Sequence, residues 1–353
     1  MGSLIGRHFR VMTFGESHGP ALGVVIDGLP AGLALGLEDL RRDLERRRPG
    51  QSPYATARKE SDEPEILSGL TEGGLTNGAP LAVLIRNRDA RSGDYAAISR
   101  IFRPGHADWT YFKKYGLTPQ PGGGRSSGRE TVARVAAGAV ARALLKPLGV
   151  TARAASLALG PVRAIKRDWD FAESNPLRFL DPDLYDQAEA AVAGAKKDGD
   201  SIGSAVELSA RGLPVGWGDP VFDKLEAKLG RAFFSIGAVR AVEFGEGLAL
   251  SAMLGSEAND PMGPEGPLSD RHGGVLGGIS TGRELTARLF AKPTPSIAID
   301  GDSVDLEGQP VKVATGGRHD PCLSPRLAPV AEAMCLIVLA DFCLAGPAKW
   351  PPA

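Results

Sequence analysis

The chain has 353 residues, of which 42% are hydrophobic and 24% are charged, and its formal net charge is -1. This composition is typical of a globular protein, and the length allows either one large domain or two moderate ones. The near-neutral charge disfavours proteins that bind nucleic acid or an anionic membrane through their overall charge.

The cysteines and the apolar runs narrow the class further. The chain has three cysteines, Cys322, Cys335 and Cys343, and none are in CxxC spacing. They predict neither a disulfide framework nor a zinc site, and no histidines are paired as in metal sites, so we expect no metal. The N-terminus lacks the apolar block of a signal peptide, and the apolar run 334–340 is too short to span a bilayer. We expect a cytoplasmic protein without a membrane partner.

The N-terminal part of the chain predicts short strands around one helix. Strands are expected at 9–14, 22–26, 66–70 and 79–86. The helix is expected over 37–48, where Leu37, Leu40 and Leu44 share one face. It ends in three consecutive arginines, which is more positive charge than a helix C-terminus needs. The long loop 87–106 is also rich in arginine and is therefore a functional candidate.

The stretch 121–130 is rich in glycine and leads into an alanine-rich helix over 131–145. Ser127 and Glu130 have the spacing of a capping box. The small residues of the helix predict close packing against other elements. Free amides at the helix start favour an anion, and Arg125 and Arg129 add forked donors. An ordinary capped helix explains this stretch equally well.

The C-terminal part predicts further strands and helices. Strands are expected at 151–159, 202–210, 238–244 and 285–290, and helices at 182–197, 221–234 and 325–344. Asp181 and Ser324 are predicted N-caps of the first and last of these helices. Strands and helices do not alternate one for one, so a doubly wound parallel sheet is not expected. We expect one α+β domain, 1–353, whose long loops gather at one place.

Three histidines lie in polar, glycine-containing contexts. His18 lies between Ser17 and a glycine, His106 follows a Pro-Gly pair, and His319 precedes Asp320. Such histidines suit proton transfer near neutral pH, although a single histidine in a turn is more often structural. Together the residues predict a strongly anionic small ligand, two acid–base histidines and glycine-lined room for a planar cofactor.

Longer motifs resemble one known family. The stretches 15–30, 124–139 and 317–332 resemble the three signatures of chorismate synthase, and 46–50, 102–108, 255–257, 273–280 and 292–296 also match in the family's order. The resemblance implies a β-α-β sandwich, with helices packed between antiparallel sheets, and a homotetramer. It implies a lyase that converts 5-enolpyruvylshikimate-3-phosphate to chorismate by 1,4-anti elimination of phosphate. This is the last step of the shikimate pathway and requires reduced FMN, which is not consumed.

The resemblance also implies catalytic roles. His18 is expected to act as the acid near the leaving phosphate, and His106 to balance the charge of the reduced flavin. Asp320 is expected to help take the proton through the flavin N5. Ser17 and Ser127 are expected to serve as hydrogen-bond relays.

Binding residues carry over in the same way. The matching flavin contacts are Arg125, Ser126, Ser127, Gly237, Ala238, Gly277, Lys292, Pro293, Thr294, Pro295, Ser296 and Arg318. The matching substrate contacts are Arg47, Arg103 and Arg129, since two carboxylates and a phosphate suit forked guanidinium donors. Arg47 also matches a position assigned to NADP in some relatives.

Some points depart from the family or stay open. Pro53 stands where many relatives have an arginine, for which Arg58 is a candidate substitute, and Gly237 replaces an Asn or Pro. An external flavin reductase is expected, although reduction by NADPH is left open. The alternative function is a flavin- or phosphate-binding protein without this activity. A nucleic-acid binder is disfavoured by the charge and the few aromatics.

Overall fold

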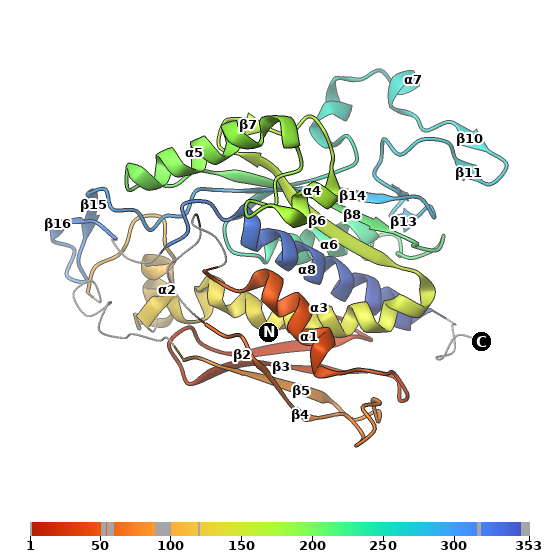
Figure 1. Cartoon of the computed structure of the whole chain (residues 1–353), viewed down its shortest axis with the longest axis horizontal. Helices are drawn as coiled ribbons and strands as arrows, with labels where there is room; N and C mark the ends of the chain where they lie inside the picture. Colours follow the sequence, from red (N-terminus) through yellow and green to blue (C-terminus); the bar gives the residue numbers. More distant parts are fainter. Residues whose placement is uncertain are drawn as a thin grey trace.

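The computed structural model describes residues 2–50, 54, 60–88, 100–118, 121–315 and 319–346. Figure 1 shows three layers, in which a helical layer lies between two sheets. Every strand pair inside these sheets is antiparallel. The predicted α+β sandwich, with helices between antiparallel sheets, is thus confirmed.

The first sheet has the strand order β1-β2-β3-β5-β4. Its strands are β1 (Leu4–Ile5), β2 (Arg10–Gly15), β3 (Ala21–Asp27), β4 (Pro64–Ser68) and β5 (Leu81–Arg86). Along β2, Val11 and Thr13 are buried whereas Met12 and Phe14 are exposed. This alternation places one face of the sheet on the helices and leaves the other face on the outside.

The second sheet has the order β7-β6-β8-β14-β9. Its strands are β6 (Thr151–Leu159), β7 (Val162–Arg163), β8 (Ser204–Arg211), β9 (Val239–Phe244) and β14 (Leu285–Ala291). The strand predicted at 202–210 differs from the expected alternation, because β8 is buried along both faces. Its polar Glu207 is covered by ion pairs with Arg167 and Arg288.

The helical layer fills the space between the sheets. It consists of α1 (Leu37–Arg47), α3 (Thr131–Leu145), α6 (Leu225–Phe234) and α8 (Ser324–Ala345). A Cβ added at Gly138 of α3 would overlap Ala333 of α8, so the small residues permit the predicted close packing. Core residues from both sheets and all four helices form one continuous cluster.

Helix α8 extends one residue beyond each end of the predicted helix 325–344 and contains the apolar run 334–340. Its 22 residues are long and apolar enough to cross a membrane, but most of the helix is buried inside the protein. Two buried acids interrupt it, Glu332 and Asp341. Asp341 accepts hydrogen bonds from the N–H groups of Arg7, His8 and Phe9, at 2.7, 2.6 and 2.9 Å. The helix is therefore a core element that also fixes the N-terminal segment.

The remaining elements lie around these layers. They are α2 (Asp108–Tyr115), α4 (Trp169–Ser174), α5 (Tyr185–Lys197), α7 (Gly255–Ala258), β10 (Met262–Gly263), β11 (Gly266–Pro267), β12 (Val275–Leu276), β13 (Ile279–Ser280), β15 (Gly301–Val304) and β16 (Pro310–Val313). Short 3-10 turns occur at Pro121–Ser126, Gly128–Glu130, Lys146–Leu148, Pro182–Leu184 and Gly247–Ala252. The strands β15 and β16 were not predicted, and neither were α2 and α4.

Three helix starts differ from their predictions. Ser127 accepts from the N–H of Arg129, but Glu130 bonds to Thr13 and Arg134 and does not complete a capping box. Ser324 donates its hydroxyl to the carbonyl of Ala205 and does not cap α8. Helix α6 begins at Leu225, four residues after the predicted start, whereas Asp181 caps the turn before α5 as predicted.

Candidate active site

The glycine-rich loop brings His18 and Arg103 to the start of α3. Gly122, Gly123 and Gly124 have φ values of 73°, 87° and 51°, a region that favours glycine. A Cβ at Gly122 would overlap the ring of His18 and lie 3.1 Å from Oγ of Ser17. A Cβ at Gly123 would lie 4.0 Å from both Arg103 Nη2 and Ser127 Cβ. The loop thus joins residues predicted from three separate motifs, 15–30, 102–108 and 124–139.

His106 forms a second group with the segment 292–296. Its Nε2 lies 2.8 Å from Oγ of Ser296, and its Nδ1 lies 3.1 Å from the carbonyl oxygen of Pro104. A carbonyl only accepts, so Nδ1 carries the hydrogen and Nε2 accepts from Ser296 in the neutral ring. Burial and the nearby Arg103 lower the pKa of His106 to about 4. His106 is therefore neutral at pH 7 in this arrangement.

The segment 292–296 also contacts the start of β9. Lys292 donates its N–H to the carbonyl of Ala238 at 3.0 Å and its Nζ to the carbonyl of Gly105 at 2.6 Å. Ala238 has φ of 73°, and a Cβ at Gly237 would meet open space. Oγ1 of Thr294 is buried and has no hydrogen-bond partner among the described residues. A buried hydroxyl in that state is what a bound polar group would satisfy.

Arg47 and Arg129 meet in a buried ion cluster, the Asp62 network, which consists of Arg47, Arg129, Glu60 and Asp62. Asp62 forms ion pairs with Arg47, at 3.0 Å, and with Arg129. Arg129 also donates to Asn87 at 3.0 Å and lies 3.8 Å from Glu60. Burial alone would raise the pKa of Asp62, but the two guanidinium groups hold it below its ordinary value.

Burial disfavours the charged form of Arg47 within the Asp62 network. Burial, followed by repulsion from Arg326, lowers the pKa of Arg47 to about 9 although Asp62 opposes this change. Arg47 is only 1% exposed, and it also donates to the carbonyl of Gly128 at 3.1 Å. A guanidinium in this state stays protonated at neutral pH and is stabilised by any further anion.

Arg103 contributes to lowering the pKa of both His106 and His319. It forms a forked pair with Asp108, at 2.6 and 2.7 Å. Burial lowers the pKa of His319, with Asp320 opposing and Arg103 contributing to this effect. Asp320 is buried and forms an ion pair with Arg326 at 2.5 Å. His106 and His319 therefore share the electrostatic influence of Arg103, whereas Asp320 is paired with Arg326.

Two predicted flavin contacts are placed differently from the others. The guanidinium of Arg125 donates hydrogen bonds to two residues of β2, to the carbonyl oxygen of Gly15 at 3.1 Å and to Oγ1 of Thr13 at 2.8 Å. Gly277 lies in the turn between β12 and β13, and the next residue, Gly278, accepts from Leu225 at the start of α6. No hydrogen bond between described residues joins this turn to the group of Lys292.

Some residues singled out in the sequence are not described in the structure, and some residues of the site were not predicted. Arg318, Pro53 and Arg58 lie outside the described residues. Sequence reasoning missed the partners of the arginines, which are Glu60, Asp62, Asn87 and Asp108, and it missed Arg326, the partner of Asp320. The two acids at 60 and 62 in an otherwise polar stretch were the available signal. In the described parts of the chain, no three His, Cys, Asp or Glu residues are grouped as a metal site.

The fold and this site define an enzyme for a small polyanion. A guanidinium group, an imidazole and two hydroxyls meet at a glycine loop, an arrangement suited to binding an anion and moving protons beside it. The sequence profile of the family "Chorismate synthase" matches residues 9–344.

Individual relatives agree. The chain is 52% identical over 343 residues to "Chorismate synthase" of Syntrophobacter fumaroxidans (strain DSM 10017 / MPOB), covering 97% of both chains. It is 50% identical over 344 residues to "Chorismate synthase" of Azoarcus sp. (strain BH72), covering 97% of this chain and 91% of that one. It also resembles a solved structure, "Crystal Structure of Chorismate Synthase", with a TM-score of 0.77 and 28% identity. That match covers 97% of this chain and 93% of the other.

The chain therefore belongs to the chorismate synthase family. It is a carbon–oxygen lyase that eliminates phosphate from 5-enolpyruvylshikimate-3-phosphate to give chorismate in the shikimate pathway.

Proposed function

We propose that the residues around the glycine loop carry out this elimination, with Arg47, Arg103 and Arg129 binding the anionic groups of the substrate. The observation that carries the proposal is the convergence of His18, Arg103 and Ser127 on Gly122 and Gly123. Each of the three arginines is already paired with an internal carboxylate, and that pairing fixes its fork in place. Burial and the neighbouring Arg326 lower the pKa of Arg47, so a substrate anion beside it would stabilise its charged form.

The residues present fit a reduced FMN cofactor. The orphan hydroxyl of Thr294, the side chains of Ser296 and Lys292, and the open backbone at Gly237 lie in one group. These residues would hold the flavin, with Ala238, Pro293, Pro295, Ser126 and Ser127 as further contacts. When bound, reduced FMN supplies electron density as phosphate leaves and regains it as the C6 hydrogen departs.

The histidines and Asp320 manage the protons in this proposal. His18 donates a proton to the leaving phosphate, assisted by Ser17, which lies beside it under the glycine loop. His106 is neutral on its own, so it takes up a proton only when an anion lies beside it and raises its pKa. Asp320 is the final proton acceptor, and Arg326 holds it in place.

Two of the predicted flavin contacts, Arg125 and Gly277, contribute differently from the others in this proposal. Arg125 anchors the loop to β2, so we propose that its contribution to the flavin site is through the backbone. Gly277 lies near the start of α6 whereas Ala238 follows its end, and the ten residues of the helix span about 15 Å. Gly277 is thus the weakest member of the proposed flavin set. Arg318 stays a proposal from the resemblance alone.

We propose a separate flavin reductase as the source of reduced FMN. The NADP role of Arg47 receives little support, because Arg47 is 1% exposed and bonded to Asp62 and Gly128. The measurement that decides is anaerobic reduction of FMN by NADPH in the presence of the protein. Rapid reduction without an added reductase would replace this proposal.

We propose that the whole chain forms one domain, works in the cytoplasm and assembles as a homotetramer. The continuous core supports the single domain. A dihedral tetramer needs at least two different interfaces, and two apolar surfaces are exposed. One is the outer face of the first sheet, with Met12 and Phe14; the other is the segment with α7, β10 and β11, which projects in Figure 1 and exposes Leu254 and Met262. Phe14→Glu and Met262→Glu should each reduce the mass measured by light scattering.

An anaerobic turnover assay tests the function. Phosphate release from 5-enolpyruvylshikimate-3-phosphate should occur only with reduced FMN, and equal release without it would contradict the proposal. His106→Asn should lower turnover strongly while FMN still binds. If the protein bound FMN and the substrate without any phosphate release, it would be a flavin- or phosphate-binding protein without this activity.

A further inference from the structure

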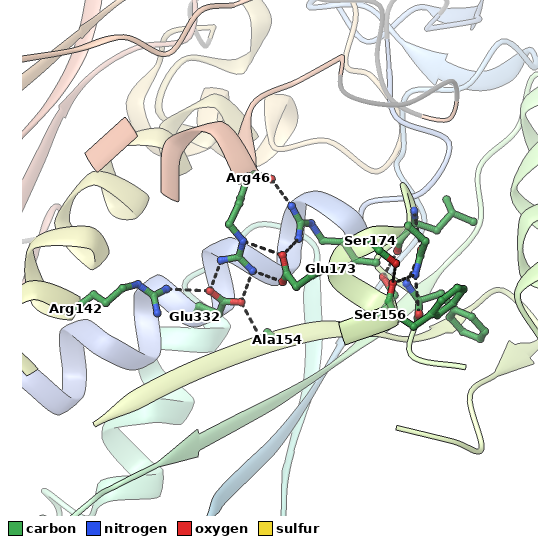
Figure 2. A network of polar contacts seen from close by, with 12 residues as sticks. Arg46, Arg142, Ala154, Ser156, Glu173, Ser174 and Glu332 are labelled. Carbon is green, nitrogen blue, oxygen red and sulfur yellow. Dashed lines mark hydrogen bonds and ion pairs between the residues drawn. The ribbon is translucent and has the colours of Figure 1, made fainter. Parts of the chain in front are cut away.

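A buried carboxylate in the middle of α8 joins the helices that carry the arginines of the site. Glu332 is 1% exposed. It accepts hydrogen bonds from Arg46 of α1 at 2.5 and 2.8 Å, from Arg142 of α3 at 3.0 Å, and from the N–H of Ala154 in β6 at 2.8 Å. Figure 2 shows these side chains converging on Glu332. We call Arg46, Arg142, Glu173 and Glu332 the Glu332 network.

The last turn of α1 is held from both sides. Arg46 bonds to Glu332 and also to Glu173, at 2.6 Å (Figure 2). Arg178 bonds to Glu173 at 2.8 Å and to the carbonyl oxygen of Arg46 at 3.3 Å, where a helix C-terminus needs a donor. The next residue, Arg47, instead reaches into the Asp62 network. Any displacement of this turn therefore moves Arg47.

The same carboxylate also fixes the other two helices of the site. Arg142 belongs to α3, whose N-terminal side carries Arg129, and Glu332 itself belongs to α8, whose first turn carries Arg326. The contacts of Arg47 span the gap between these helices, since its Nε lies 3.3 Å from Oγ1 of Thr131. Glu332 thus helps to set the distances between the guanidinium groups of Arg47, Arg129 and Arg326.

Stability alone does not account for this arrangement. Burying an ion cluster in an apolar helix gives little net stability compared with apolar residues of similar size. Burial alone would lower the pKa of Arg46, yet Glu332 and Glu173 hold it above its ordinary value. The network is thus well paired, and its geometry is specific.

We propose that Glu332 is a positioning residue for the anion-binding arginines, acting on Arg47 through Arg46. This inference rests on the proposed substrate role of Arg47. Glu332 touches no atom of the proposed reaction, so its removal should weaken substrate binding more than it slows the chemical step.

Steady-state kinetics of Glu332→Gln test the proposal. We expect KM for 5-enolpyruvylshikimate-3-phosphate to rise about tenfold, while kcat changes far less. Tenfold is the low end of the effects of removing a residue that holds a binding residue in place. If Glu332→Gln folds poorly, Arg46→Met serves as the second variant. It leaves the pair of Glu332 and Arg142 intact, and it should raise KM in the same way. Asp43→Asn is the matched control, because it removes another buried carboxylate from Arg142, at 2.8 Å, and leaves Glu332 untouched.

A double-mutant cycle separates positioning from general destabilisation. Glu332→Gln should add little to KM in an Arg47→Met background, because both changes act on the same contact. Additive effects, an unchanged KM in both Glu332→Gln and Arg46→Met, or an equal rise in Asp43→Asn would overturn the proposal. An unchanged KM in Arg47→Met alone would instead show that the proposed substrate role of Arg47 is wrong.

Discussion

Arg46 and Arg47 are neighbours in the chain, yet their guanidinium groups belong to two different buried networks. Their pKa values shift in opposite directions. The pKa of Arg46 is raised, because Glu332 and Glu173 outweigh the effect of burial. The pKa of Arg47 is lowered to about 9, because burial and repulsion from Arg326 outweigh Asp62. Each network pairs two arginines with two acids, but Arg46 bonds to two carboxylates, Glu332 and Glu173, whereas Arg47 shares Asp62 with Arg129. In our proposal the first of these adjacent arginines is an anchor and the second binds the substrate.

The largest effect on the fold is expected from Asp62→Asn. This change leaves the buried Arg47 and Arg129 without their shared carboxylate, and removing one partner of a buried ion cluster costs about 3 to 5 kcal/mol. Urea unfolding measures the loss. A loss as small as that of an exposed pair would mean that the Asp62 network is not buried in solution.

The Glu332 network should respond less to the loss of Arg178. Arg178→Ala removes one hydrogen bond to the end of α1 and one ion pair, for about 1 to 2 kcal/mol of unfolding free energy. Arg178 has φ of 49°, so Arg178→Gly should lose less than Arg178→Ala because glycine relieves the left-handed conformation. Equal losses would indicate that no such relief occurs.

The two networks and His106 should lose their stability in different pH ranges. The folded pKa of His106 is about 4 against an ordinary 6.5, so the unfolded state binds more protons between these values. Stability should therefore fall as the pH drops from 6.5 to 4, by about 1 kcal/mol after allowance for partial exposure. His106→Asn should reduce this slope in urea unfolding at several pH values and leave the part that comes from His319, whose pKa is also lowered.

The acids of the networks behave differently. The pKa of Asp62 and that of Glu173 are both lowered from ordinary values of 3.8 and 4.5. Their contributions are therefore present above those values and are lost only as the pH falls below them. A slope above pH 5 that is lost on Asp62→Asn would contradict this assignment.

The smallest effect is expected at a surface pair. Glu65 and Arg86 form an ion pair at 2.7 Å between β4 and β5, and both side chains are well exposed. Solvent and salt screen such pairs. Glu65→Gln should leave the unfolding midpoint unchanged within error, which makes it the surface counterpart of Asp62→Asn.

Much of the layered fold was predictable because hydrophobic periodicity reports burial. The strand at Thr151–Leu159 and the helix at Thr131–Leu145 fall where the pattern placed them, and the resemblance supplied the sandwich. The strands β15 and β16 were missed because they are short and mostly polar. Ser324 was mistaken for a cap because its hydroxyl has a closer partner in β8. That competition depends on tertiary contacts, which no local pattern contains.

The candidate site was predictable residue by residue but not in its pairings. His18, His106 and Arg103 stood out in the sequence, and the structure places His18 and Arg103 at one glycine loop and His106 within the electrostatic influence of Arg103. Asp62 and Glu332 did not stand out, since a single acid in a polar loop or an apolar helix has many explanations. Their importance comes from long-range partners, such as the pair of Arg46 and Glu332, 286 positions apart.

The place of α8 bears on how the protein is made. This helix is the last element of the described chain, yet it contacts α1, α3, α6, β6 and β8. The ribosome releases it after every partner has been synthesised. The inner face of the second sheet at β6 and β8 thus stays uncovered until α8 has been synthesised, whereas the first sheet can pack on α3 earlier, and nascent chains must be shielded from one another during that interval.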